Sequence, residues 1–299
     1  MASIARTALN TGLRAGRVGG PSTLRAAAPR AAVPFVRSIV SGTARLDAEV
    51  HAGAPLTQTN RAEITLRRFW KNAHIKEDDG GYLVTLDHRN LKTPGGTKLV
   101  VPANRRLLAI LIANEWENQE QVLKQHALPL TSLASRAIDG LSDPQTREAV
   151  IDSLLSYLET DTICYPDEAP EALVRLQKEH WDPLFKWLKD TYGVTLNLAE
   201  GFSPAQQDPA TIEKLRSVIE GFDIWELAAF ERAVYATKSF VIALALVTGR
   251  ISANEAAQAS HVEVASQIER WGEVEDTHDV DHQDIRRALG SVATLLAKV

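Results

Sequence analysis

The spacing of apolar residues changes once along this chain, and that change limits the folds open to it. Between residues 68 and 102, apolar and polar side chains alternate in short runs such as Tyr82–Leu86, separated by turn clusters such as Asp78–Gly81. This pattern predicts a small antiparallel sheet of three to five strands. From Ala103 onward, apolar residues recur every three or four positions, which predicts helices. The predicted fold class is therefore α+β, with a small N-terminal β-rich domain followed by a larger C-terminal helical domain.

Several of the expected helix boundaries carry local signals. Asp143 directly precedes Pro144. A capping residue followed by a proline in the first turn is a common signal of a helix start, so we expect a helix to begin here. Ser252 and Glu255 have the spacing of a capping box. The segment 233–247 is apolar nearly all round, so we expect its helix to be the buried centre of the fold. The four longest predicted helices cover residues 169–191, 224–247, 252–271 and 281–297.

The first 46 residues differ in composition from the rest of the chain. They contain seven arginines, no lysine and no acidic residue, and Asp47 is the first acid. This composition predicts a presequence for import into the mitochondrial matrix, and a disordered basic tail is the alternative. A secretory signal needs a continuous apolar core of roughly 7–15 residues, which prolines and glycines interrupt here. We expect residues 1–46 to be a targeting presequence and residues 47–62, which are polar, to be a linker.

The charge and composition of the remaining chain exclude several classes of protein. Without residues 1–46 it carries 26 basic and 38 acidic side chains, a net charge of −12, which disfavours binding to nucleic acid. One cysteine, Cys164, excludes an internal disulfide and any multi-cysteine metal site. The longest apolar run, Phe240–Val247, has eight residues, well short of the roughly 20 that a membrane helix needs. We expect no membrane anchor.

Motifs that would indicate an enzyme are mostly missing from the sequence. It has no phosphate-binding loop, no dinucleotide fingerprint and no nucleophile elbow, and Gly95-Gly96 is better explained as a hairpin turn. His278 and His282 are four residues apart and could share a helical face as metal ligands, with Asp279 or Asp281 adding an oxygen. Asp281 also suits a helix start, where acidic groups complement the helix dipole, so we predict no metal site in this segment. We also predict no cofactor and no catalytic residue in the chain.

One carboxylate falls where the pattern predicts an apolar surface. At 100° per residue, Glu115 and Gln119 lie within the arc of a helix that also holds these apolar residues: Leu107, Leu108, Leu111, Ile112, Trp116 and Val122. A carboxylate in such a place must be paired, hydrogen-bonded or neutral. Glu115 could be an acid–base group with a perturbed pKa, an inter-domain hydrogen-bond acceptor, or part of a surface left open for a partner.

A dense acidic segment follows the third of the long helices. Trp271 ends the predicted inner face of that helix, and five acids lie within eleven residues: Glu269, Glu273, Glu275, Asp276 and Asp279. Such a run is usually a solvated face. It could equally be a docking surface for a basic partner, with Trp271 fixing its geometry.

Six short motifs along the chain resemble, in order, those of one family. They are Arg68–Lys71, Leu86–Arg89 with Leu91–Pro94, Ala113–Trp116, Leu128–Thr131, Asp161–Tyr165 and Trp271–Asp279. Together they resemble the mitochondrial ATP synthase assembly factor 2 chaperones, over about residues 64 to 290. Each motif alone is weak, but six in order with compatible spacing are specific.

The resemblance implies an N-terminal β-rich domain with a helix over residues 63–125 and an orthogonal helical bundle over residues 126–299. It implies a matrix chaperone, with no cofactor or turnover, that binds the unassembled alpha subunit of the synthase and shields the surface that the beta subunit later covers. Trp116 and Glu273 match family motifs. We therefore expect a monomer whose partner-binding residues are Glu273, Trp271, Glu269, Asp276, Trp116 and Glu115.

Two other classes of function remain open from the sequence. A matrix enzyme that depends on a metal or a carboxylate would use Glu115 or the pair His278 and His282. This hypothesis predicts bound metal or a small-molecule pocket around these residues. A permanent structural subunit of the synthase would instead co-purify with the finished complex.

Overall fold

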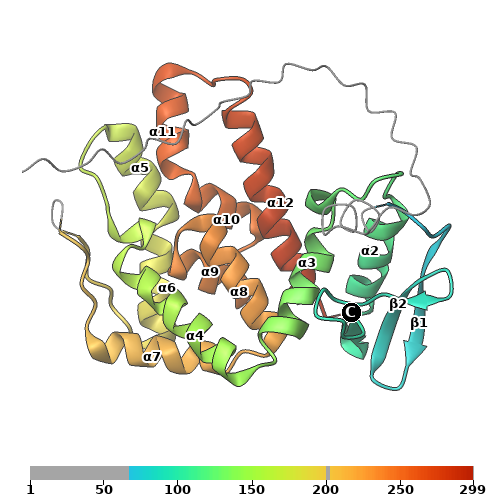
Figure 1. The fold of residues 1–299 in the computed structure, drawn as a ribbon. Coiled ribbons are helices and arrows are strands. Elements are labelled where there is room, and N and C mark those ends of the chain that lie inside the picture. Colours follow the sequence, from blue (N-terminus) through green and yellow to red (C-terminus); the bar gives the residue numbers. More distant parts are fainter. Residues whose placement is uncertain (1–66, 200–202, 299) are drawn as a thin grey trace, which may run out of the picture. The chain divides into compact units, whose positions relative to one another are not determined.

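Four short antiparallel strands open the part of the chain that the computed structural model describes, which is residues 67–199 and 203–298. β2 is the central strand and pairs with each of the others. The strands are β1 (Ala73–Asp78), β2 (Gly81–Leu86), β3 (Arg89–Asn90) and β4 (Val100–Pro102). The predicted sheet is confirmed, and Figure 1 shows α2 (Arg106–Glu117) against it.

The burial of β2 differs from the expectation of one buried face. Val84 and Leu86 are buried, as the alternating pattern predicts, but Leu83 and Thr85 on the opposite face are buried too. The chain turns tightly between Asp78 and Gly81, where Gly81 has a φ of 146°. β1 therefore pairs with β2 along its whole length, from Asp78 opposite Gly81 to Ala73 opposite Leu86. The flanking strands and α2 enclose β2, so polarity alternation alone underestimates its burial.

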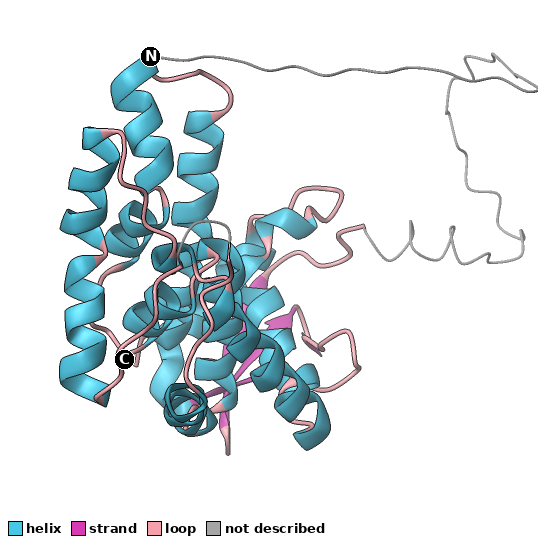
Figure 2. Ribbon diagram, turned by 90° about the vertical axis from the view of Figure 1, so that its left-hand side faces the viewer, coloured by secondary structure: helices cyan, strands magenta, loops and turns pink. Residues whose placement is uncertain are grey.

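Helices make up most of the remaining described chain (Figure 2). Five short helical turns, η1 to η5, connect the longer elements; η1 follows β4, and the other four lie between α2 and α5. They cover Ala103–Arg105, Gln125–Ala127, Arg136–Gly140, Ser156–Glu159 and Thr162–Cys164. The longer helices after α2 are α3 (Pro129–Ser135), α4 (Pro144–Leu155), α5 (Glu171–His180), α6 (Asp182–Tyr192), α7 (Pro209–Glu220), α8 (Ile224–Thr237), α9 (Phe240–Val247), α10 (Ala253–Ser260), α11 (Val262–Trp271) and α12 (His278–Leu296). Within the described residues, no helix combines the length and apolar character needed to cross a membrane.

Three of the long predicted helices are each divided in two, which the periodicity did not predict. α5 and α6 meet at Trp181, because Pro183 at the start of α6 cannot continue the hydrogen bonding of a preceding helix. Between α8 and α9, Lys238 adopts a left-handed φ of 56° and the Ser239 side chain caps α9. α10 ends and α11 begins at His261. Apolar periodicity carries across such short breaks, so it overestimates helix length.

The local boundary signals are more accurate than the periodicity. The Asp143 carboxylate accepts a hydrogen bond from the backbone N–H of Thr146 and caps α4. Ser252 and Glu255 form both hydrogen bonds of the predicted capping box at α10. The last predicted helix begins three residues earlier than expected, at His278.

The buried centre of the helical part is formed by α8 and α9. Phe230 and Phe240 contact edge to face there, with ring centroids 4.9 Å apart, and α12 packs on α8. This confirms the expected buried centre, although two helices rather than one form it. The α+β fold class, a small N-terminal sheet followed by a larger helical bundle, is confirmed as well.

A buried arginine joins the β-rich part to the helices. Arg105, only 1% exposed, donates to the backbone carbonyl of Leu295 at 2.5 Å and to the Asp223 carboxylate at 3.3 Å. Residues 67–199 and 203–298 all belong to one compact unit, and a domain boundary at residue 125 stays a prediction. The predicted presequence and linker lie outside the described residues.

Candidate functional site

The connection between α11 and α12 forms the first candidate site, which we call the α11–α12 tip and define as residues 271–280. α11 ends because Gly272 takes a φ of 84°, a conformation that favours glycine. The turn is held by a hydrogen bond from the Val274 N–H to Nδ1 of His278, at 3.0 Å. Figure 1 shows the tip at one end of the two helices.

The tip exposes apolar side chains among its carboxylates. Trp271 is 70% exposed, Val274 55% and Val280 58%. The expectation that Trp271 lies on an inner face is wrong, because the chain breaks at His261 and α11 starts a new helical phase. The guanidinium of Arg270 lies 5.0 Å from the ring centroid of Trp271. Exposed apolar groups beside acids are typical of a surface that binds another protein.

The acids of this segment differ in how they are engaged. Glu269 accepts two hydrogen bonds from Arg175 of α5, at 2.7 and 2.8 Å, and so ties α11 to α5. Within the described residues, no cationic nitrogen lies within 4.0 Å of the carboxylates of Glu273 or Asp276. Both of these carboxylates are exposed and can meet a cation of a partner.

A cavity of about 280 Å³ lies directly under the tip. Apolar residues of α5, α10 and α11 form much of its lining, while Glu273, His278 and His282 are among its polar residues. Burial lowers the pKa of a third histidine at this cavity, His261. In residues 67–199 and 203–298, no three His, Cys, Asp or Glu side chains are grouped to hold a metal ion. His278 Nδ1 accepts the hydrogen bond that holds the tip, and His282 lies about one turn further along α12, where it lines the cavity.

Glu115 is a residue of α2, and its carboxylate reaches the N-terminus of α3 and so joins the two helices. Its carboxylate accepts hydrogen bonds from the backbone N–H of Leu130 at 2.7 Å, and from the N–H and Oγ1 of Thr131 at 2.9 and 2.7 Å. Burial raises the pKa of Glu115 above its usual value, against the effect of these hydrogen bonds. Both oxygens are occupied, which favours the structural interpretation of this carboxylate over catalysis.

Trp116 and Gln119 complete the junction around Glu115. Trp116 Nε1 donates to Oγ1 of Thr131 at 3.0 Å, and Trp70 Nε1 donates to the Trp116 carbonyl at 3.3 Å. The Gln119 side chain is buried and bonds to the Glu115 carbonyl at 3.1 Å. The six predicted partner-binding residues thus fall into two groups, one at α11–α12 and one at α2–α3.

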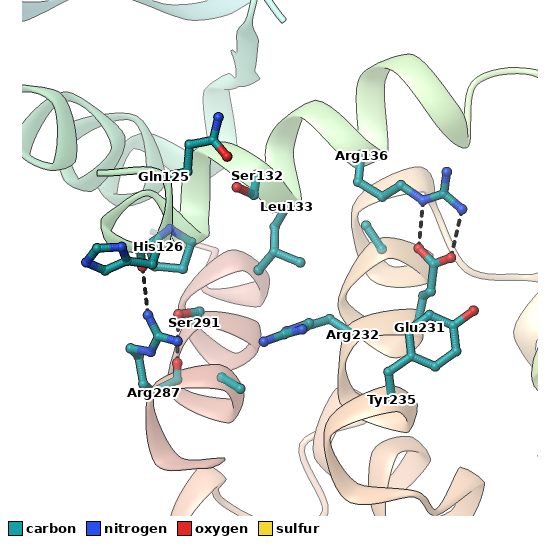
Figure 3. Close-up of a pocket in the computed structure, with 13 residues that line it drawn as sticks. Gln125, His126, Ser132, Leu133, Arg136, Glu231, Arg232, Tyr235, Arg287 and Ser291 are labelled. Atoms are coloured by element: carbon teal, nitrogen blue, oxygen red, sulfur yellow. Dashed lines mark hydrogen bonds and ion pairs between the residues drawn. The ribbon is translucent and has the colours of Figure 1, made fainter. Parts of the chain in front are cut away.

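Sequence reasoning missed a second cavity, which lies between α3, α8 and α12 (Figure 3). Its volume is about 330 Å³. Arg136 donates two hydrogen bonds to Glu231, at 2.8 and 2.7 Å, and Arg287 donates to the carbonyl of His126 at 2.7 Å. Arg232 also lines the cavity (Figure 3). The one local signal is the pair Glu231-Arg232, two charged residues between the apolar runs 227–230 and 233–234 of α8.

This α+β fold exposes apolar and acidic side chains together at the α11–α12 tip. Comparison with known proteins identifies its family. The family model described as ATP12 chaperone protein matches residues 67–189. The chain is 38% identical over 252 residues to protein atp12, mitochondrial, of Schizosaccharomyces pombe, with 82% of this chain and 85% of that protein covered. It is 31% identical over 278 residues to protein ATP12, mitochondrial, of Saccharomyces cerevisiae, with 79% and 86% covered.

Solved structures give the same result. The crystal structure of Atp12 from Paracoccus denitrificans matches with a TM-score of 0.68 and 35% identity, covering 78% of this chain and 98% of that one. A putative chaperone from Agrobacterium tumefaciens matches with a TM-score of 0.70 and 28% identity, covering 82% and 92%. The chain belongs to the ATP12 chaperone family. The resemblance found in the motifs is confirmed, and the chain is a mitochondrial chaperone of that family.

Proposed function

We propose that this chaperone assists assembly of the catalytic sector of ATP synthase in the mitochondrial matrix. It binds the unassembled alpha subunit and shields the surface that the beta subunit later covers. The observation that carries this proposal is the α11–α12 tip of a chain that belongs to the ATP12 chaperone family. Trp271, Val274 and Val280 are exposed there beside carboxylates that form no ion pair with any described residue. The resemblance in the motifs supports the alpha subunit as the partner.

The mechanism that fits this surface is passive holding. A subunit without its neighbours exposes an oligomer interface, and large exposed apolar patches lead to aggregation. A chaperone that covers the patch lowers the concentration of the aggregation-prone species by mass action. The beta subunit then competes for the same surface and displaces the chaperone. The chaperone acts as a monomer, without cofactor or nucleic acid, and no reaction at Glu115 or His278 is needed.

Within the tip, the apolar and acidic side chains have different roles. Burial of Trp271 against the partner supplies affinity, since large aromatic residues dominate binding at the centres of interfaces. Glu273 and Asp276 orient the complex by meeting cations of the alpha subunit. Glu269, held by Arg175, keeps α11 in place behind them. Glu115 and Trp116 contribute by fixing α2 to α3.

The substitution Glu273→Lys tests this assignment. We expect it to weaken binding of the alpha subunit at least about tenfold, or about 1.4 kcal/mol, because a cation would face the cations of the partner. Since Glu273 is exposed, the fold should be unchanged. Binding is measured by co-purification of the alpha subunit and by titration of the purified chaperone.

A matched control makes the same charge change away from the tip. Glu213 is an exposed residue of α7 that forms no ion pair with any described residue, and Glu213→Lys should bind the alpha subunit as the unaltered chain does. Equal binding by Glu273→Lys and the unaltered chain, with both folded by circular dichroism, would remove Glu273 from the binding surface.

A further inference from the structure

A cavity on the β-rich part of the molecule has a different chemistry from the tip. It lies between β2, β3, the segment 91–99 and α2, and its volume is about 520 Å³. Its lining is mainly apolar and aromatic, with three cationic side chains. These residues are Phe69, Trp70, Leu86, Arg89, Asn90, Leu91, Lys92, Lys98, Trp116 and Leu123.

Aromatic side chains line one side of this cavity, and their exposure increases from Trp70 to Phe69. Trp70 is buried and its ring centroid lies 5.1 Å from that of Trp116. Phe69 contacts Trp70 edge to face at 5.0 Å, yet Phe69 itself is 62% exposed. The guanidinium of Arg89 lies 5.6 Å from the centroid of Phe69. An exposed aromatic residue next to a rigid aromatic pair is typical of an anchor point in a protein interface.

The three cations of this cavity have no acidic partner in the described residues. No carboxylate oxygen there lies within 4.0 Å of a side-chain nitrogen of Arg89, Lys92 or Lys98. In the cavity of Figure 3, two of the three lining arginines are compensated, because Arg136 is paired with Glu231 and Arg287 with Asp284. In a chain whose net charge is negative, three uncompensated cations in one place are unusual.

Two of these cations are held next to each other by the backbone. Lys92 and Lys98 pair across an antiparallel bridge, so their side chains share one face. Like charges directly opposite each other in a sheet are destabilising. Asp139 of η3 contacts the turn between the two lysines, where it accepts hydrogen bonds from Thr93 Oγ1 at 2.6 Å and from the Gly95 N–H at 2.7 Å. It forms no ion pair with either lysine. An anion between the two lysines would remove the repulsion.

We propose that this cavity is a docking site for an acidic segment of a partner protein that also carries an apolar side chain. The apolar side chain enters between Phe69 and the two tryptophans, and carboxylates on either side of it meet Arg89 and the lysine pair. Arg89 suits a carboxylate because its guanidinium can donate two parallel hydrogen bonds. A nucleic acid or lipid surface fits less well, since the remainder of the chain is strongly acidic and would repel it. The site is independent of the α11–α12 tip and of the identity of the alpha subunit.

The test uses the whole chain and a fluorescein-labelled peptide of sequence Asp-Glu-Leu-Phe-Glu-Asp. We expect saturable binding with a Kd of about 100 μM or tighter, measured by fluorescence anisotropy. Two further peptides separate the contributions of charge and apolar contact. One replaces the four acids by lysine and the other replaces Leu-Phe by Ser-Ser, and both should bind at least about tenfold more weakly.

Variants of the chain locate the site. The double substitution Lys92→Glu and Lys98→Glu should weaken binding of the acidic peptide at least about tenfold, and Phe69→Ala about fivefold or more. Lys76→Glu on β1 is the matched control, since Lys76 is exposed but does not line the cavity, and it should bind as the unaltered chain does. Because all three cavity residues are exposed, the variants should remain folded.

Several results would overturn the proposal. One is no saturable binding of the acidic peptide by the unaltered chain. Another is equal binding by the Ser-Ser peptide, which would indicate attraction by charge alone. Unchanged binding by the double lysine variant would place the peptide elsewhere. Binding to vesicles containing phosphatidylserine or to an RNA hairpin in preference to the peptide would also contradict it.

Discussion

At the scale of single residues, Asp161 is a carboxyl group whose burial changes its titration. It is buried, and accepts hydrogen bonds from the N–H groups of Ile163 at 3.2 Å and Val241 at 3.0 Å. Burial raises its pKa to about 6, despite hydrogen bonds from Ser239 and the backbone. Because the pKa in the folded state lies above the ordinary value of about 3.9, the folded state holds the proton more tightly than the unfolded state. Asp161 therefore contributes stability at low pH that is lost as pH rises from about 4 to about 6.

The substitution Asp161→Asn removes this titration while keeping the shape of the side chain. We expect the free energy of unfolding of the unaltered chain, relative to the variant, to fall by on the order of 2 kcal/mol between pH 4 and pH 7. Urea unfolding at several pH values measures the difference. If that difference were constant across this pH range, Asp161 would not be the titrating group.

At the scale of elements, the turn at Gly95 is held to η3 by one carboxylate. Asp139 of η3 accepts hydrogen bonds from Gly95 and Thr93, and a Cβ placed on Gly95 would lie 2.8 Å from that carboxylate. Gly95→Ala must therefore displace Asp139 from the turn. We expect a loss of about 1–2 kcal/mol of stability, measured by thermal unfolding.

Gly80→Ala is the control for this substitution at another turn of the sheet. A Cβ on Gly80 would meet no atom within 4 Å, so its stability should stay within about 0.5 kcal/mol of the unaltered chain. Equal effects of the two substitutions would mean that the contact with Asp139 does not stabilise the turn.

Across the whole molecule, the sequence predicted those features that depend on local signals. The strands around β2, the cap at Asp143 and the capping box at Ser252 all arise from residues a few positions apart. The break at Lys238 was missed, since a left-handed residue between two apolar helices leaves the periodicity nearly unchanged. Trp271 was placed inward for the same reason, because the break at His261 changes the helical phase.

The two candidate binding surfaces show the same limit. The α11–α12 tip could be found from the sequence because Trp271 and its acids lie close together in the chain. The cavity on the sheet could not, because Phe69, Lys98 and Trp116 come together only through the pairing of β2 and its packing on α2. These three residues lie 18 to 47 positions apart in the chain, and such long-range packing leaves no local pattern in the sequence.

Shielding of the alpha subunit is tested most directly by co-expressing it with this chain and separating the soluble proteins by size-exclusion chromatography. We expect a soluble complex of the two proteins that dissociates when the beta subunit is added, because the beta subunit competes for the shielded surface. Aggregation of the alpha subunit to the same extent with and without this chain would contradict the proposed holding mechanism.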